Sequence, residues 1–176
     1  MGLVREGNAE RGFTLIELMI VVAIVAVLAA VMIPMFMKEG TRAKAKSEVS
    51  PMFSELSHKE DQYKQEFGSY ISAAACPSAA STSGTDVTTA CFTTGSDWTK
   101  LRIQPSEKKL TCSYVVTAGL AATNPTTTVP SWVTTCKGCG TLAAPSTSWY
   151  YIVASCPETS YFTASWDAKI RASDGK

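Results

Sequence analysis

Two hydrophobic patterns follow each other in the first third of the chain. Residues 18–37 (LMIVVAIVAVLAAVMIPMFM) carry no charge, and twenty apolar residues are about the length of a helix that crosses a bilayer core. Beyond them, apolar residues recur at steps of three, four or seven, at Val49, Met52, Phe53, Leu56, Tyr63 and Phe67. We predict one helix from about Phe13 to Phe67, apolar all round in its first half and amphipathic in its second half.

Charged residues occupy the face opposite the apolar stripe, namely Glu55, Lys59, Asp61 and Lys64. We expect this face in solvent, and the stripe packed on a sheet of the same chain rather than on a cofactor. Bends are expected at Pro34, Gly40 and Pro51, since a proline in a helix interior costs about 3 kcal/mol. Without bends the predicted helix is roughly 80 Å long, at 1.5 Å per residue.

The remaining residues have the pattern of a small β-rich head. Residues 72–97 are small, polar and turn-prone, which favours an exposed connecting loop. Four β-branched or aromatic runs then lie between turn signals, at residues 110–117, about 127–134, 149–155 and 160–166. We predict an α+β fold in which the long N-terminal helix packs on a small antiparallel sheet. A chain of 176 residues has room for one such domain plus one extended element.

All six cysteines lie in this head, at Cys76, Cys91, Cys112, Cys136, Cys139 and Cys156. An even number in a Ser/Thr/Gly-rich region is typical of the disulfide framework of an exported domain, so we expect three intramolecular disulfides. We expect Cys136 and Cys139 to bond to more distant cysteines rather than to each other, because closing a longer loop removes more entropy from the unfolded chain. The cellular compartment would then be oxidising.

An alternative is a reduced domain in which Cys136 and Cys139 supply half of a zinc site. A second CxxC is missing and His58 is the single histidine, whereas a structural zinc site takes four nitrogen or sulfur ligands. We expect no metal and no cofactor. The chain has 16 Lys and Arg against 15 Asp and Glu, which favours no class of charged partner, so a nucleic-acid partner stays open. No catalytic arrangement surrounds His58, so we do not expect an enzyme.

A carboxylate stands at the start of the apolar run. Glu17 would cost roughly 2 to 4 kcal/mol near the centre of a bilayer and less towards the interface, and residues this costly usually have a partner. An ordinary signal peptide is cut after its apolar run at small residues, and Val27-Leu28-Ala29 is only a weak candidate. The stronger candidate lies before the run, between Gly12 and Phe13.

The motif around this point is Arg11-Gly12 followed by FTLIE and a hydrophobic run that contains Pro34. It closely resembles the class III signal of type IV prepilins. The resemblance covers residues 11 to about 70, where FGSY ends it, and it is diffuse beyond. One departure is Ala26, where the family often has a glycine that is associated, with the proline, with local melting of the helix in filaments.

The resemblance implies the following processing and assembly. A membrane peptidase cleaves after Gly12 and methylates the new N-terminal residue, Phe13, so that residues 1–12 are a leader. Residues 13–37 form the transmembrane and filament-core helix, 38–70 its amphipathic half and 71–176 the head. Assembly would use Phe13, Glu17 and Pro34, with the α-amino group of Phe13, in the same or a neighbouring subunit, as the counter-charge of Glu17. The partners would be other pilin subunits, the prepilin peptidase, the inner-membrane assembly machinery and, before assembly, the membrane.

The orientation has conflicting signals. Arg5 and Arg11 precede the apolar run, but four basic residues follow it, namely Lys38, Arg42, Lys44 and Lys46, against the positive-inside rule. The cysteine-rich head and the resemblance favour an N-terminus inside. The function expected is that of a major or minor subunit of a type IV pilus; the alternatives are a pseudopilin of a type II secretion system and a pilus-tip adhesin or DNA binder.

Overall fold

The structure is a computed structural model that describes residues 12–105, 107–121, 123, 125, 128–135 and 145–173. It divides into two compact units, Met1–Glu39 and Gly40–Lys176, and we describe each by itself. One helix, α1, runs from Leu15 to Phe67, so that its residues belong to both units. The predicted helix is therefore confirmed, although it begins at Leu15 rather than Phe13, and it is unbroken at Pro34, Gly40 and Pro51.

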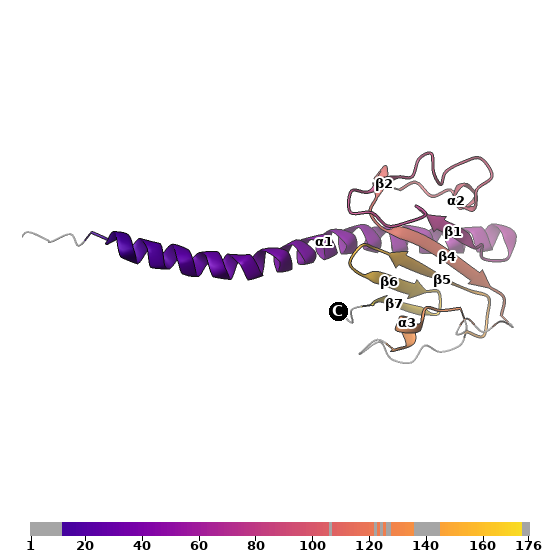
Figure 1. Cartoon of the computed structure of the whole chain (residues 1–176). Coiled ribbons are helices and arrows are strands. Elements are labelled where there is room, and N and C mark those ends of the chain that lie inside the picture. The colour runs from indigo at the N-terminus through magenta and orange to yellow at the C-terminus, as the bar shows by residue number, and fades with distance from the viewer. Residues whose placement is uncertain are drawn as a thin grey trace, which may run out of the picture. The chain divides into compact units, whose positions relative to one another are not determined.

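The second unit contains a five-stranded antiparallel sheet in the order β1-β4-β5-β6-β7 (Figure 1). Its strands are β1 (Ala73–Cys76), β4 (Ser113–Gly119), β5 (Trp149–Ser155), β6 (Ser160–Ala164) and β7 (Asp167–Ala172). A separate ribbon pairs β2 (Thr85–Asp86) with β3 (Lys109–Leu110). The longest ladder joins β4 to β5 in seven residue pairs, from Ser113↔Ser155 to Gly119↔Trp149. A long N-terminal helix followed by an antiparallel sheet confirms the predicted α+β class.

Alternate residues of β5 serve two different cores, because successive side chains of a strand point to opposite faces of the sheet. Tyr150, Ile152 and Ala154 pack with the buried stripe of α1, which consists of Ala45, Val49, Met52, Phe53 and Leu56. Trp149 and Tyr151 pack on the other face, against Val133 of the short helix α3 (Ser131–Thr135). Both faces of the sheet are thus covered. The predicted stripe of α1 is confirmed from Val49 to Leu56, whereas Tyr63 is half-buried and Phe67 is 63% exposed.

Two predictions about the head need correction, and one strand was missed. Residues 127–134 do not form a strand in the part that is described; α3 lies there instead, because Pro130 lacks the N–H that a ladder needs but suits the start of a helix. Residues 72–97 are more than a connecting loop, since they contain β1 and β2 and the start of the helix α2 (Asp97–Lys100). Strand β7 was not predicted; it pairs with β6 and carries the ion pair between Asp167 and Arg171.

Two backbone positions are under steric constraint. A Cβ atom added to Gly119 would lie 2.2 Å from Cζ2 of Trp149, because that ring covers the glycine across the β4–β5 ladder. Arg102 has a φ of 53°, in the left-handed region that favours glycine, just beyond the end of α2. A non-glycine residue there stores strain of the order of 1 kcal/mol.

Candidate assembly segment

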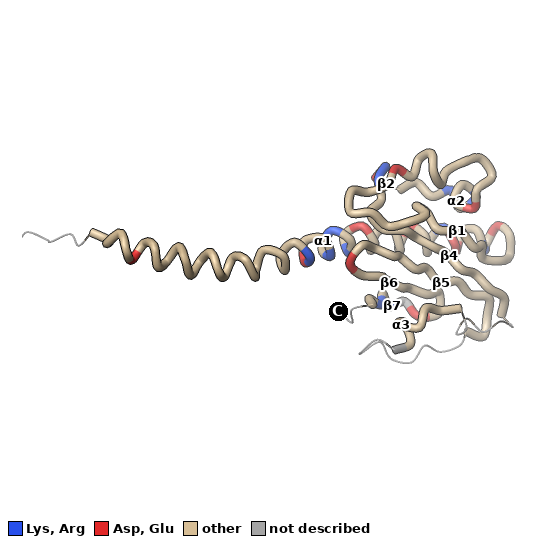
Figure 2. The backbone as a smooth tube through the Cα atoms, viewed as in Figure 1, with Lys and Arg blue, Asp and Glu red and all other residues tan. Residues whose placement is uncertain are grey.

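The first unit exposes nearly all of its apolar side chains. Every residue from 13 to 37 except the half-buried Ala29 is exposed, and Phe13 is exposed to 88%. Figure 2 shows this stretch as a run of helix without charge, between one acidic position and the first basic ones. Helix α1 is long and apolar enough to cross a membrane, judged by length and composition. An apolar surface this large needs a membrane or other protein chains to cover it.

Glu17 lies in the first turn of α1, where it makes a capping box with Thr14. The Thr14 hydroxyl donates to Oε2 of Glu17 over 2.9 Å, and the Thr14 backbone N–H donates to the same oxygen over 3.2 Å. In return, the Glu17 backbone N–H donates to Oγ1 of Thr14 over 3.3 Å. This reciprocal arrangement satisfies donors that every helix start leaves open. Sequence analysis missed it, although the Thr-x-x-Glu spacing before an apolar run is its signature.

The remaining predicted processing residues lie beside this cap. Gly12 has no atom within 4 Å of the place where a side chain would begin. Residues 1–11 lie outside the described part, so cleavage after Gly12, methylation of Phe13 and the role of its amino group stay predictions. Pro34 lies inside α1, and the helix continues through it in the single chain.

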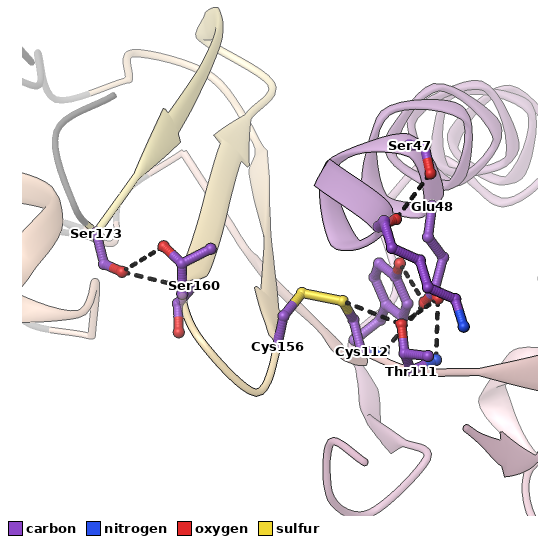
Figure 3. The surroundings of a disulfide bond; sticks show 10 residues. Ser47, Glu48, Thr111, Cys112, Cys156, Ser160 and Ser173 are labelled. Atoms are coloured by element: carbon purple, nitrogen blue, oxygen red, sulfur yellow. Dashed lines mark hydrogen bonds between the residues drawn. A yellow bond between two sulfur atoms is a disulfide. The ribbon is translucent and has the colours of Figure 1, made fainter. Parts of the chain in front are cut away.

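In the second unit, Glu48 joins α1 to the start of β4 (Figure 3). Its Oε2 accepts from the Thr111 backbone N–H over 2.9 Å and from the Thr111 hydroxyl. Its Oε1 accepts from the Cys112 N–H over 3.1 Å and from the Tyr114 hydroxyl over 3.0 Å. Burial of the Tyr114 ring, together with the nearby Glu48 charge, raises the pKa of that phenol far above its usual range. With four donors on one carboxylate, Glu48 ties the helix to the start of the sheet.

Two more glutamates of α1 accept backbone N–H groups of the head. Glu55 Oε1 accepts from Gln104 over 2.9 Å, so that this residue, expected in solvent, is half-buried and bonded. Glu60 Oε2 accepts from Ile71 over 3.1 Å, and Glu60 is fully buried. Sequence analysis assigned no contact to Glu48 or Glu60.

Two disulfides join cysteines in the described part of the head. One joins Cys76 at the end of β1 to Cys91, and the other joins Cys112 to Cys156, which flank β4 and β5 (Figure 3). Cys136 and Cys139 lie outside the described residues. The expected third disulfide and the bonding partners of these two cysteines therefore stay predictions.

Comparison with known proteins finds similarity over part of the chain. Residues 7–33 match the family model of the prokaryotic N-terminal methylation motif. Over 44 residues the chain is 57% identical to the type IV major pilin protein PilA of Myxococcus xanthus (strain DK1622), a match that covers 25% of this chain and 20% of that protein. The chain thus spans about a fifth of the length of the curated relative that it matches. No solved structure matches the chain.

These observations define a class of protein. A long N-terminal apolar helix, followed by an antiparallel β-sheet head, is a pilin-like α+β fold. The N-terminal methylation motif and the partial match to a major pilin make part of the chain similar to type IV pilins.

Proposed function

We propose that this chain is a structural subunit, major or minor, of a type IV pilus filament. The observation that carries the proposal is the exposed, uncharged helix surface of residues 18–37, which directly follows a prepilin-type motif. The subunit would wait in the inner membrane as a single-pass protein and then enter an extracellular filament. The filament would serve motility, adhesion or DNA uptake.

The two units support a division of labour between assembly and display. In the second unit the apolar stripe of α1 is already covered by the sheet, with Leu56 at 0% exposure. In the first unit the apolar residues have no such cover, so only a bilayer or the helices of other copies can shield them from water. We therefore assign the leader to residues 1–12, the filament core to 13–37, the amphipathic half of the helix to 38–70 and the displayed head to 71–176.

Glu17 supports a mechanism for register between subunits. An ionised carboxylate among packed apolar helices loses several kcal/mol of solvation unless a counter-charge approaches it. The Thr14 cap offers Glu17 hydrogen bonds but no charge. Cleavage after Gly12 would create a cation, the α-amino group of Phe13. We propose that the amine of an incoming subunit meets Glu17 of a subunit already in the filament and thereby sets the axial position of each new helix.

The test uses a deletion strain that expresses single variants of the chain, with sheared surface filaments analysed by mass spectrometry. Wild-type filaments should contain a chain that begins at N-methylated Phe13. Gly12→Val should block cleavage, because a side chain crowds the extended backbone in the peptidase. Glu17→Ala should be inserted and cleaved normally but should enter few filaments. Glu66→Ala, at an exposed glutamate of the same helix, is the matched control and should assemble like the wild type.

Two outcomes separate the explanations for Glu17. Thr14→Ala removes the capping hydroxyl but keeps the charge, so it should assemble far better than Glu17→Ala; equal defects would show that the cap rather than the charge matters. Normal incorporation of Glu17→Ala would refute the charge mechanism. A deletion strain that keeps its filaments but loses protein secretion would replace the pilus proposal with that of a pseudopilin.

A further inference from the structure

Glu60 is a carboxylic acid whose surroundings disfavour the ionised form. It is 0% exposed in the core between α1 and the sheet. Its Oε2 accepts one hydrogen bond, from the Ile71 N–H, while its Oε1 has no partner among the residues that the structure describes. A buried carboxylate with one open oxygen is costly when ionised and much less costly when neutral.

The bonded N–H belongs to the connection between α1 and β1, residues 68–72. Gly68 has a φ of 80°, and its N–H donates to the Lys64 carbonyl, which ends the helix. Tyr70 then packs edge-on against the Tyr150 ring with centroids 4.7 Å apart, and the Ser72 hydroxyl accepts from the Ala118 N–H. The connection therefore lies on the sheet, with Glu60 beneath it.

Among the described residues, the ionisable groups that face Glu60 either disfavour its charge or leave it unpaired. Asp61 on α1 adds a negative charge nearby, and it accepts from the Tyr70 hydroxyl. Tyr70 and Tyr150 also face Glu60, and burial raises the pKa of both phenols to about 12, so neither is ionised at neutral pH. The nearby cation, Lys64, lies over the Tyr70 ring at 4.4 Å from its centroid.

We propose that Glu60 is a protonation-controlled latch. While it is neutral it holds the 68–72 connection on the sheet, and when it ionises it draws in water and lets that connection open. All residues of the latch lie in the second unit, so a test of the latch does not depend on whether the filament proposal is correct.

The direction of the pH effect follows from the burial. Desolvation raises the pKa of Glu60 to about 7, opposed by the Ile71 N–H and aided by the Asp61 charge, whereas in the opened connection its pKa returns to the ordinary 4.5. The closed form therefore has its full stability below pH 4.5, loses stability as the pH rises towards 7, and keeps the lower stability above it. The opening equilibrium should rise roughly tenfold to a hundredfold between pH 5 and 8.

Amide hydrogen exchange of the full chain in detergent micelles tests this latch. Exchange of peptides covering residues 68–72, divided by the intrinsic rate at each pH, should speed up over that range in the wild type. Glu60→Gln, which cannot ionise, should remove the pH dependence. Glu55→Gln, at a half-buried glutamate that also accepts one backbone N–H, is the matched control and should keep it.

A direct titration covers the case in which Glu60→Gln fails to fold. The carboxyl carbon of Glu60, followed by NMR in the wild-type chain, should titrate with a midpoint near 7. A midpoint near 4.5 overturns the proposal. So does corrected exchange at residues 68–72 that is flat from pH 5 to 8, or a Glu60→Gln chain that keeps the wild-type pH dependence.

Discussion

The two halves of α1 have the same secondary structure but differ in how their apolar side chains are covered. Over residues 18–37 the helix shows apolar side chains on all sides, and nearly all of them are exposed. From Gly40 to Phe67 it shows the sheet an apolar stripe plus three glutamates that accept hydrogen bonds from the head. The apolar side chains of the first half thus have no cover within their own unit, whereas the apolar stripe of the second half is covered by the sheet.

The comparison teaches that helix formation and helix stabilisation have separate sources here. Leu, Ala and Met favour a helix intrinsically, but helices in water gain most of their stability from packing. The second half finds that packing inside the chain. The first half has to find it elsewhere, and this requirement, rather than any catalytic group, is what points to assembly as its role.

The largest contrast is expected from one matched pair of leucines. Leu56→Ala removes a side chain with no exposed surface and should lower the free energy of unfolding of the head by about 2–5 kcal/mol. Leu28→Ala, at a side chain that is 56% exposed, should change this free energy of unfolding by no more than about 0.5 kcal/mol. All four tryptophans lie after residue 97, so denaturant unfolding followed by their fluorescence reports on the head alone. Equal losses from both variants would show that the two halves are energetically one element.

The reverse contrast is expected from an introduced charge. Val25→Arg should make the free energy of membrane insertion less favourable by about 3 kcal/mol, because arginine at the centre of a spanning helix costs about that much. Ser54→Arg, on the exposed face of the second half, should insert like the wild type. Resistance of each variant to alkaline extraction from membranes measures the difference. Full retention of Val25→Arg in the membrane would contradict a spanning role for the first half.

A third prediction asks how closely the head is packed. Gly119→Ala should cost about 1–3 kcal/mol of head stability, because the new methyl group collides with the Trp149 ring. Gly40→Ala, where the added carbon meets open space on a helix, should instead be neutral or add up to about 1 kcal/mol. Thermal unfolding of the two variants side by side decides, and a harmless Gly119→Ala would mean that the Trp149 ring moves aside freely.

The smallest effect is expected at Arg102. Arg102→Gly should raise head stability by about 0.5–1 kcal/mol, since glycine adopts the left-handed backbone without strain. The lost ion pair with Glu66, 3.6 Å apart and exposed, contributes little. Arg102→Ala loses the same ion pair but keeps the strain, so chemical denaturation should find it no more stable than the wild type. A gain from alanine equal to that from glycine would remove the backbone explanation.

The elements that the sequence predicted are those with a strong local pattern. The apolar run, the stripe of α1 and the aromatic strand β5 are visible in a few neighbouring residues. Strands β1 and β7 are not, because AAAC and DAKIRA have little strand propensity of their own and owe their conformation to pairing with β4 and β6.

The polar contacts of the helix could not be predicted from the sequence, for a different reason. Glu48 bonds to Thr111, 63 residues away, and periodicity says only that Glu48 lies near the stripe. Glu60 stands next to Asp61, and no local feature marks the first as buried and the second as exposed. The Thr14–Glu17 cap, by contrast, could have been predicted from the sequence, since both partners lie within one turn.

The tie at Glu48 has a mechanical consequence. A pull along the second half of α1 would reach the sheet through Glu48, which bonds to Thr111, Cys112 and Tyr114 at the start of β4. The Cys112–Cys156 disulfide joins that same point covalently to the end of β5. Tension on the helix would therefore be shared at once by β4 and β5, whose seven-pair ladder lies inside the sheet.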